Sequence, residues 1–500
     1  MRQIIRQIII TANCFPALFL QVQAQSSLPV SDKSFSTSTE YRLEAFGSAA
    51  SGLNTPFWMV SNRYGVVPLL SENGYMRTAA MYNILYNNNI RIQAGLDLVA
   101  SAPRYRNFYA QQLYAEISYK FLNMRIGSKE NYTSLFDRDL SSGDMVMSAN
   151  AMPIPEINLS VPQFTVIPYT KGWLQFRGDF AVGRSYDNTY LEKTAGAKQH
   201  YVKNMLWHHK SLHIRLSDTR DDFPFSAVIG IRHSAQWGGI STNDEFGAQP
   251  QAFSDFIRIF FGKGGGSNAF ESEQINVLGN HYGSYDFKFG YLNPKFDIYL
   301  YKQHFFDDAS GMEMYNYPDG LYGLQVNPKN FSWIDKIVVE YLNTTNQSGP
   351  VHFIAYDHDR YPGYGGGADN YYNNEIYFQG VSYFGRNLGA PLVLSTEYNR
   401  NGRIDYSNTR LRAYHLGISG LLSNQIAYRL LTTSSANFGT TSRPFLSRKD
   451  AFSCAFRISY CHPRLEGWLF STEAAHDSGG LTGKSTGISL SISKSGIVSN

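Results

Sequence analysis

Residues 285–301 read YDFKFGYLNPKFDIYLY, and this stretch decides the fold class. Apolar or aromatic side chains take every second position before and after the pair Asn293-Pro294, with mostly polar or small residues between them. A period of two is typical of a β-strand with two unlike faces, and Asn and Pro are typical of turns. The stretch therefore predicts a β-hairpin.

The same alternation returns along most of the chain, from about residue 75 to the end. A water-soluble sandwich or propeller would bury the apolar face of such strands in a core. A transmembrane barrel would turn that face to lipid and line its lumen with the polar face. The alternation by itself does not distinguish the two architectures. The clearest segments are 90–98, 113–121, 174–180, 212–216, 452–460 and 488–492.

Three further features favour the transmembrane barrel. Aromatic side chains gather at segment ends, as at Tyr285 and Tyr460, where the two membrane interfaces would lie. Segments of about nine to eleven residues match the length that crosses a bilayer at a tilt. Short connections such as 292–295 alternate with long ones such as 261–283. We therefore expect an all-β, antiparallel transmembrane β-barrel of about 16–18 strands, with minor helical elements, over residues 75–500.

One long connection departs from the alternation. Phe253, Phe256, Ile257 and Phe260 follow a helical spacing within residues 251–261. This spacing predicts a short amphipathic helix, and another irregular strand is the alternative.

The composition excludes several classes of protein. Only 17% of the 500 residues are charged, whereas 15% are aromatic. Disordered chains have the opposite balance. The net charge of +4 is small for this length, and no run of Lys or Arg supports nucleic-acid binding.

The N-terminus predicts export. Residues 1–24 combine two early arginines, an apolar stretch and small residues before Ala24, which is typical of a secretory signal peptide. A first transmembrane helix is the alternative, which Asn13 and Pro16 disfavour. The Ser/Thr-rich sequence that follows predicts a linker and periplasmic segment over residues 25–74. Taken together with the barrel, export places the protein in the outer membrane of a Gram-negative bacterium.

Two cysteines, Cys454 and Cys461, remain after removal of the signal. An oxidising compartment would allow them to pair. Because Cys454 falls in a patterned strand, their pairing stays open.

The chain contains no strong catalytic motif, and we expect no catalytic residue, metal or cofactor. His208, His209 and His213 invite comparison with a metal site, but on a strand the last two share a face with Arg215. Neighbouring carboxylates such as Asp307-Asp308 point apart on a strand, unlike the facing pair of a glycosidase. Residues 357–359, Asp-His-Asp, would bind Ca²⁺ or be solvated.

The loop 359–380 is the most suggestive binding segment. It interleaves tyrosines with asparagines and glycines, a composition typical of adaptable binding surfaces. An inert external loop is the alternative. Inward-facing arginines would add positive charge suited to acidic sugars, or would form ordinary salt bridges in the lumen. The residues that we expect to contact polysaccharide are Tyr361, Tyr364, Tyr371, Tyr372, Asn373, Asn374, Arg177 and Arg215.

A set of motifs resembles the Wzi-type capsule assembly proteins of Bacteroides-like bacteria, across nearly the whole exported chain. The resemblance implies an outer-membrane barrel of about eighteen strands. It also implies a lectin-like role in attaching or organising capsular polysaccharide, without enzymatic activity. The motifs are Thr55-Pro56-Phe57-Trp58, Asn62-Arg63-Tyr64-Gly65, residues 168–173 (PYTKGW), 208–212, Gln236-Trp237-Gly238-Gly239 and 279–287.

We therefore expect an outer-membrane protein that binds capsular or other surface polysaccharide, with outer-membrane lipid around it and no nucleic acid as partner. The first alternative is an outer-membrane channel for saccharides or other solutes. The second is an enzyme embedded in the outer membrane that acts on lipid or glycan.

Overall fold

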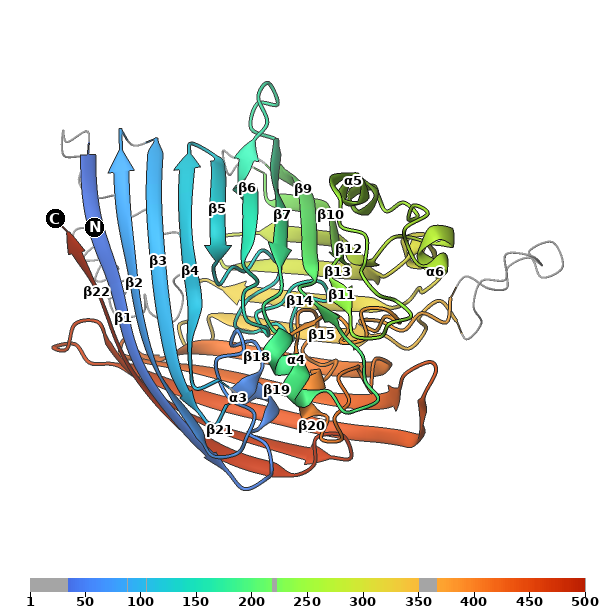
Figure 1. Cartoon of the computed structure of the whole chain (residues 1–500). Coiled ribbons are helices and arrows are strands. Elements are labelled where there is room, and N and C mark those ends of the chain that lie inside the picture. The colour runs from blue at the N-terminus through green and yellow to red at the C-terminus, as the bar shows by residue number, and fades with distance from the viewer. Residues whose placement is uncertain (1–34, 88, 105, 218–222, 350–366, 500) are drawn as a thin grey trace.

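The computed structural model describes residues 35–87, 89–104, 106–217, 223–349 and 367–499. Eighteen antiparallel strands form one closed sheet, so the predicted fold class is confirmed at the upper end of the expected count (Figure 1). The strands are β1 (Phe35–Ala50), β2 (Asn73–Tyr86), β3 (Ile90–Ala102), β4 (Phe108–Tyr119), β5 (Leu122–Ser128), β6 (Glu156–Val166), β7 (Leu174–Arg184), β9 (Leu206–Ser217), β10 (Phe225–Trp237), β12 (Asn280–Leu292), β13 (Phe296–Phe306), β14 (Gly320–Pro328), β15 (Lys336–Asn343), β18 (Leu411–Ser423), β19 (Ile426–Gly439), β20 (Pro444–Cys461), β21 (Trp468–Gly479) and β22 (Ser485–Ser499).

Short elements occupy the connections between these strands. Two small ladders pair β8 with β11 and β16 with β17. The predicted helix over 251–261 is confirmed as α5. The short elements are α3 (Phe57–Val60), α4 (Asn188–Thr194), β8 (Val202–Lys203), β11 (Ile240–Ser241), α5 (Phe253–Phe261), α6 (Glu271–Ile275), α7 (Ala309–Met312), β16 (Ser382–Tyr383), β17 (Arg386–Asn387) and a 3₁₀ turn, η1 (Thr396–Tyr398). Within the described ranges, none of the helices has the length and apolar character needed to cross a membrane.

The first and last strands close the sheet on itself. β1 pairs with β2 on one side and with β22 on the other, in a register that runs from Ser38↔Ser499 to Ala50↔Gly487. Closure leaves no row of unpaired backbone groups at a sheet edge, which hydrocarbon would not tolerate.

The barrel begins earlier than the alternation predicts. Residues 25–74 were expected to be a linker and periplasmic segment, yet residues 35–50 form the barrel strand β1. The outward side of β1 carries Leu43, followed by the small residues Ala45, Gly47 and Ala49, so its apolar signal is weak. The Ser/Thr-rich sequence at the start of β1 predicted a linker, although it belongs to a strand.

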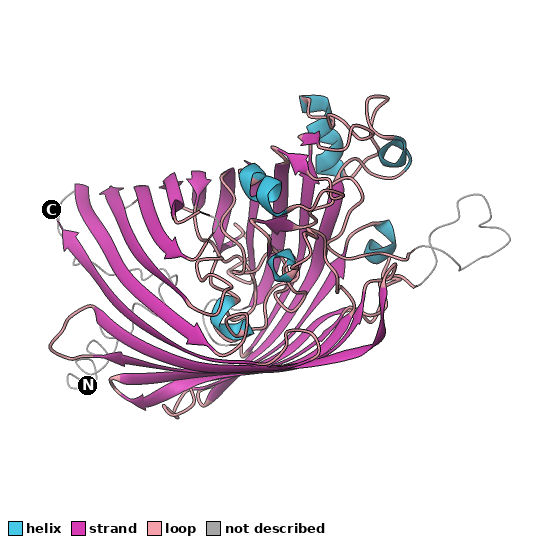
Figure 2. Ribbon diagram, turned by 60° about the horizontal axis from the view of Figure 1, so that its bottom comes forward, coloured by secondary structure: helices cyan, strands magenta, loops and turns pink. Residues whose placement is uncertain are grey.

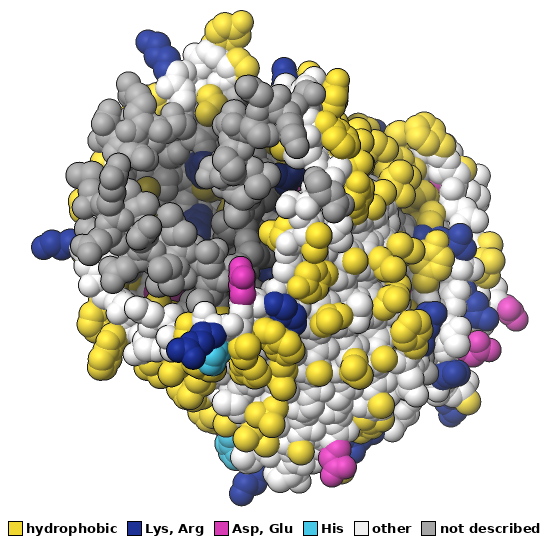
Figure 3. Space-filling view, turned by 90° about the vertical axis from the view of Figure 1, so that its left-hand side faces the viewer, with side chains coloured by type: hydrophobic (Ala, Val, Ile, Leu, Met, Phe, Trp, Pro, Cys, Tyr) yellow, Lys and Arg dark blue, Asp and Glu magenta, His cyan; other side chains and the backbone are white. Residues whose placement is uncertain are grey.

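The predicted inversion of polarity holds along the wall. Leu113 and Leu490 face outward, where 59% and 62% of their surface is exposed, and hydrophobic side chains lie over the outer surface in Figure 3. Side chains of the opposite parity, such as Asp97, Gln303 and Glu473, are at most 1% exposed inside the barrel. The apolar face therefore lies outside and the polar face inside, as in barrels that sit in lipid.

Connections alternate in length between the two barrel ends. We call one end of the barrel the turn end, because it holds short connections such as 120–121 and 293–295. The start of β1 and the end of β22 lie at this end as well. We call the opposite end the loop end, because it holds the long connections, including 238–279 and 344–410. Bacterial barrels place short turns in the periplasm and long loops outside the cell.

Three connections from the loop end fold back into the lumen and pack against its wall; we name them the plug (Figure 2). The plug consists of residues 51–72, 129–155 and the described residues 367–410. Its segments bind one another: Ser148 Oγ donates to Gly389 O at 2.7 Å, and Arg386 Nη2 donates to Val67 O at 3.1 Å. The plug and the inner wall therefore form one continuous packed interior.

Polar contacts attach the plug to the wall. Glu340 of β15 accepts hydrogen bonds from Ser141 Oγ at 2.6 Å, from Ser142 N at 2.7 Å and from Tyr301 Oη at 2.5 Å. Trp58 of α3 donates through Nε1 to Thr433 of β19 at 3.1 Å. Such bonds satisfy polar groups that water does not reach.

Arginines surround a second buried carboxylate. Glu473 of β21 contacts Arg63 of the plug, Arg457 of β20 at 2.7 Å and Arg429 of β19 at 3.5 Å. The side chain of Glu473 is 1% exposed, so this cluster is a buried ion network that includes both plug and wall.

The two cysteines lie seven residues apart on β20. An odd separation on a strand places them on opposite faces, Cys454 outward and Cys461 toward the lumen, roughly 23 Å apart along the strand. They therefore do not form a disulfide with each other.

Replacing Glu473 by Ala leaves three arginines facing one another without the anion that holds them. We expect the free energy of unfolding to fall by roughly 3–5 kcal/mol, the cost of removing one member of a buried ion network. Urea unfolding in detergent micelles measures the difference. Arg448→Ala is the control, because Arg448 and its partner Asp450 are both more than half exposed and such a pair contributes about 1 kcal/mol or less. Equal urea midpoints for the two variants would contradict the assignment.

Candidate functional site

The structure does not bring the eight predicted polysaccharide-contacting residues together. Tyr361 and Tyr364 lie outside the described residues. Four others lie in the plug, and the two arginines lie near the turn end of the lumen. The predicted set therefore divides between two regions of the protein.

Tyr371 and Tyr372 are part of the packed interior and are 0% and 1% exposed. The Tyr371 hydroxyl contacts Asp319 Oδ2 at 3.1 Å, and the Tyr372 hydroxyl donates to Met145 O at 2.8 Å. Both rings pack against Phe305, with centroids 4.8 and 5.1 Å away. Stacking on a sugar needs an open ring face, so the expectation that these two rings present themselves to polysaccharide is corrected: protein atoms cover them.

Asn373 and Asn374 stabilise the turns of the same segment. Asn373 Nδ2 donates to Tyr406 O at 3.1 Å, and Asn373 Oδ1 accepts from Tyr406 N at 2.8 Å. Asn374 Oδ1 accepts from the backbone N–H groups of Ile376 and Tyr377, both at 3.0 Å. Their amides thus already hold backbone of the plug.

Arg177 of β7 and Arg215 of β9 do face the lumen, as the alternation predicts. Both guanidinium groups lie over the ring of Phe164, at 5.0 and 4.3 Å from its centroid. Arg177 donates to Thr133 O and Arg215 to Gln175 Oε1, each at 2.8 Å. These acceptors are neutral. Lys and Arg side chains are visible inside the hollow that faces the viewer in Figure 3, on the side where the described ends of the chain lie.

The three histidines do not form a cluster. His209 contacts Glu156 at 3.0 Å and Asp179 at 2.9 Å, and His213 contacts Asp286 at 3.0 Å, all inside the barrel. His208 has the opposite parity and faces outward. The two inward imidazole rings, those of His209 and His213, therefore already have carboxylates as partners.

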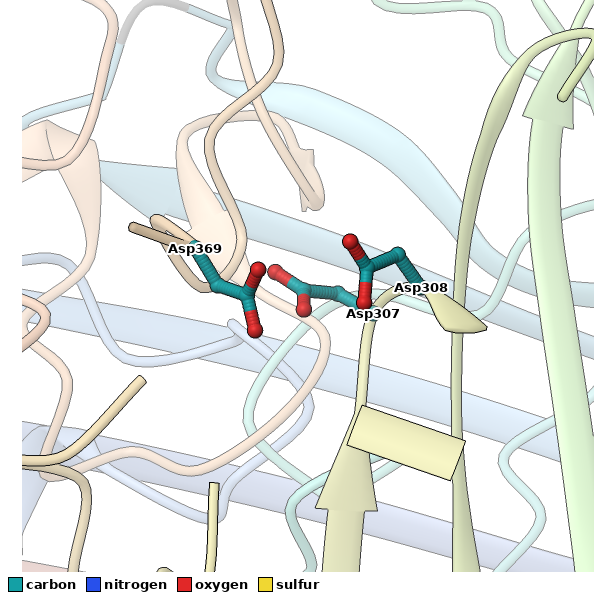
Figure 4. A group of neighbouring side chains, drawn as sticks. All are labelled: Asp307, Asp308 and Asp369. Atoms are coloured by element: carbon teal, nitrogen blue, oxygen red, sulfur yellow. The ribbon is translucent and has the colours of Figure 1, made fainter. Parts of the chain in front are cut away.

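Three carboxylates do meet at the loop end: Asp307, Asp308 and Asp369 (Figure 4). One oxygen from each lies within 4.8 Å of the others. Burial, and then the Asp308 charge, raises the pKa of Asp369 to about 7, and burial and the Asp369 charge hold the pKa of Asp307 well above its ordinary value. The group therefore retains protons near neutral pH, because carboxylates this close repel when ionised. The expectation that Asp307 and Asp308 point apart is wrong, because both follow the end of β13 and do not lie on a strand. Residues 357–359, the other predicted carboxylate group, lie outside the described residues.

Inside the described barrel, a hollow of about 60 Å³ lies between Tyr64, Lys129, His209 and Tyr282. This volume is well below the roughly 300–1,000 Å³ of small-molecule pockets. A larger hollow, about 740 Å³, lies against strands β10 to β15 and is lined by outward residues such as Ile229 and Phe289. Neither hollow has the form of an internal saccharide site.

A group of arginines that was not predicted from the sequence lies at the loop end. Arg403 holds Asp405 with two parallel bonds, Nε to Oδ1 at 3.0 Å and Nη2 to Oδ2 at 2.7 Å. Arg443, from the connection between β19 and β20, contacts the same carboxylate. We name Arg400, Arg403 and Arg443 the external arginine group.

The charges of the external arginine group are not balanced. One aspartate that is 4% exposed contacts two guanidinium groups that are 30% and 42% exposed. Arg400 is exposed and donates to a neutral acceptor, Asn54 Oδ1, at 2.8 Å. The group therefore presents excess positive charge at the loop end. Its members are separated by up to 43 residues in the sequence, so no local motif marks it.

A solved outer-membrane barrel shares this fold. The Escherichia coli protein Wzi, described as an outer-membrane carbohydrate-binding β-barrel involved in group 1 capsule assembly, is similar over 90% of this chain and 83% of its own, with a TM-score of 0.54 and 12% identity. Pseudomonas aeruginosa OccK5 (OpdH) gives a TM-score of 0.47 and 7% identity, over 92% of this chain and 98% of its own. Pseudomonas aeruginosa OpdQ gives a TM-score of 0.46 and 9% identity, over 93% of this chain and 100% of its own. No curated protein sequence matches the chain.

A family model agrees with the resemblance seen in the motifs. The model of the capsule assembly protein Wzi matches residues 59–392, which is about two thirds of the chain. The match begins within α3 and spans most of the plug, together with the wall from β2 to β15. The chain therefore belongs to the Wzi family of capsule assembly proteins.

Proposed function

We propose that this protein is an outer-membrane barrel of a Gram-negative bacterium that binds surface polysaccharide without covalent chemistry and helps to assemble or retain the capsule. One observation carries the proposal: a member of a capsule assembly family fills its lumen with its own loops. The Escherichia coli barrel of the same fold is described as carbohydrate-binding, which supports the same role here.

The filled lumen favours a binding surface over a channel. Three plug segments occupy the interior and bind both one another and the wall, through contacts such as Ser142 N to Glu340 and Phe57 N to Asp477 Oδ2 at 2.8 Å. A solute path needs a water-filled lumen. The same contacts hold the loop end in a fixed shape, which reduces the entropy lost when a ligand binds.

The external arginine group is the part of the loop end best suited to an acidic polysaccharide. Planar guanidinium groups bind carboxylates and phosphates through paired hydrogen bonds. Arg403 alone satisfies both oxygens of Asp405, so Arg443 adds a charge that a ligand can use. Binding would be strengthened by repetition, because a polymer offers many equivalent charged units.

Deleting the gene should release capsular polysaccharide into the medium while its synthesis continues. Loss of the attachment surface removes retention but not polymerisation. Comparing cell-bound and free polymer in the mutant and the complemented strain measures the effect. The released polymer should keep its length distribution, since a binder cuts nothing. Unchanged retention would contradict the proposed role, and altered length would favour the enzyme alternative.

The purified protein should pass little ionic current in planar lipid bilayers, because plug side chains occupy the lumen. Single-channel recording in 1 M KCl tests this expectation, with an open bacterial porin as the positive control. Stable open-channel steps would favour the alternative of a solute channel.

Replacing Arg443 by Gln should weaken binding of the host's acidic polysaccharide by up to about fivefold, because one exposed ion pair contributes about 0.2–1 kcal/mol. Arg403 still neutralises Asp405 in this variant, so the fold is retained. Titration of the polymer onto immobilised protein in detergent gives the affinities. The matched control is Arg448→Gln, another exposed arginine that pairs with its own Asp450. Equal affinities for the two variants would show that the polysaccharide does not contact Arg443.

A further inference from the structure

Helix α5 leaves the loop end and packs against the outside of the barrel, beside β7, β9 and β10 (Figure 1). The ring of Phe256 lies 5.4 Å from His208 and 5.7 Å from Trp237, measured between centroids. Phe260 lies 6.1 Å from Phe180. These wall residues have outward parity, so the contact is on the face that elsewhere meets lipid.

The wall beneath α5 carries polar residues as well as apolar ones such as Ala235 and Trp237. Inward neighbours such as His209, Arg232 and Tyr282 make the luminal contacts of β9, β10 and β12, so the residues next to them point outward. The outward residue Lys210 donates to Phe260 O, and its Nζ lies 3.7 Å from the Phe260 ring centroid. Charged and imidazole groups are costly against hydrocarbon. The outward polar residues are His208, Lys210, His233 and His281.

The other face of α5 is apolar and exposed. Phe253, Ile257 and Phe261 recur every four residues along the helix and are 77%, 41% and 63% exposed. The helix has one acid, Asp255, which is 4% exposed and accepts from Ala252 N at 2.9 Å. Nothing anionic on α5 itself therefore interrupts its exposed row.

We propose that α5 lies in the outer leaflet of the membrane, in the plane of the interface, with acyl chains against Phe253, Ile257 and Phe261. Short amphipathic helices with an aromatic and aliphatic face bind the boundary between headgroups and acyl chains. The helix thereby covers the outward polar residues of this part of the wall with an apolar surface and anchors the connection 238–279 to the membrane.

Continuity with the outer wall selects lipid as the occupant. Leu212 of β9 and Ile229 and Ile231 of β10 are exposed outward, nearer the turn end than His208 and His233. The exposed part of the apolar band thus stops at His208 and His233, and α5 extends an exposed apolar surface over them toward the loop end. A lipid surface that already surrounds the barrel reaches this row without a further partner.

The charge at the end of α5 fits an interfacial position. Lys263 lies two residues after the end of the helix, is exposed, and places its Nζ 5.8 Å from the Phe261 ring. Lysines beside buried aromatic rings reach toward the headgroup region, where phosphates are available.

Spin-label accessibility in lipid tests the placement. Cys454 and Cys461 are replaced by Ser, and a single nitroxide is attached at Ile257→Cys or Phe261→Cys in the protein reconstituted into liposomes. Leu113→Cys on the outward wall serves as the lipid reference, and the exposed Lys198→Cys in the connection between β7 and β9 serves as the water reference. Mobility of unboiled samples in SDS gels confirms that each variant folds.

We expect labels on α5 to behave as at Leu113, colliding more with O₂ than with a water-soluble nickel complex, which reverses the ratio seen at Lys198. A ratio like that at Lys198 would overturn the proposal, because the helix would then lie in water. Low accessibility to both reagents would also overturn it, in favour of a second copy or another protein on this face. The polysaccharide proposal does not depend on any of these results, since the external arginine group lies on other connections.

Discussion

Every backbone N–H and C=O of the wall needs a partner, because hydrocarbon offers none. The closed ring of eighteen strands satisfies this requirement, and the pairing of β1 with β22 completes it. Alternating side chains then have to divide between lipid outside and a polar interior. The remaining features follow from that division: an interior rich in carboxylates, hydroxyls and arginines that loops of the same character can fill.

The plug shows how a polar interior becomes a rigid one. Glu340 and Glu473 each gather several donors from different segments, so a single carboxylate fixes wall and plug together. Removing any donor leaves a buried polar group without its partner, which makes the arrangement specific as well as stable. A loop end held rigid in this way supports our proposal that the protein binds capsular polysaccharide on a fixed surface and does not pass solutes through an open lumen.

Much of the fold was predictable because period two is a local signal. β1 was not predicted to be a strand, because small residues occupy much of its outward face. The position of the plug inside the lumen was not predicted either, because the composition of a loop does not show whether it lies inside or outside a barrel. Tyr371 and Tyr372 illustrate the second limit: tyrosines suit a binding surface and a hydrogen-bonded interior equally well. Arg443 and Asp405 meet through folding alone, 38 residues apart, so no sequence pattern marks them. The helical spacing of α5 was visible, whereas its position against the wall depends on the parity of β9 and β10.

The seam between β1 and β22 has a consequence for biogenesis. Because β1 pairs with β22, the barrel cannot close until β22 has crossed the inner membrane. Until then the nascent sheet carries two open edges and a lipid-seeking surface in an aqueous compartment, the condition under which strands aggregate. The order of the strands therefore leaves both edges in need of shielding from other chains until the last pairing forms.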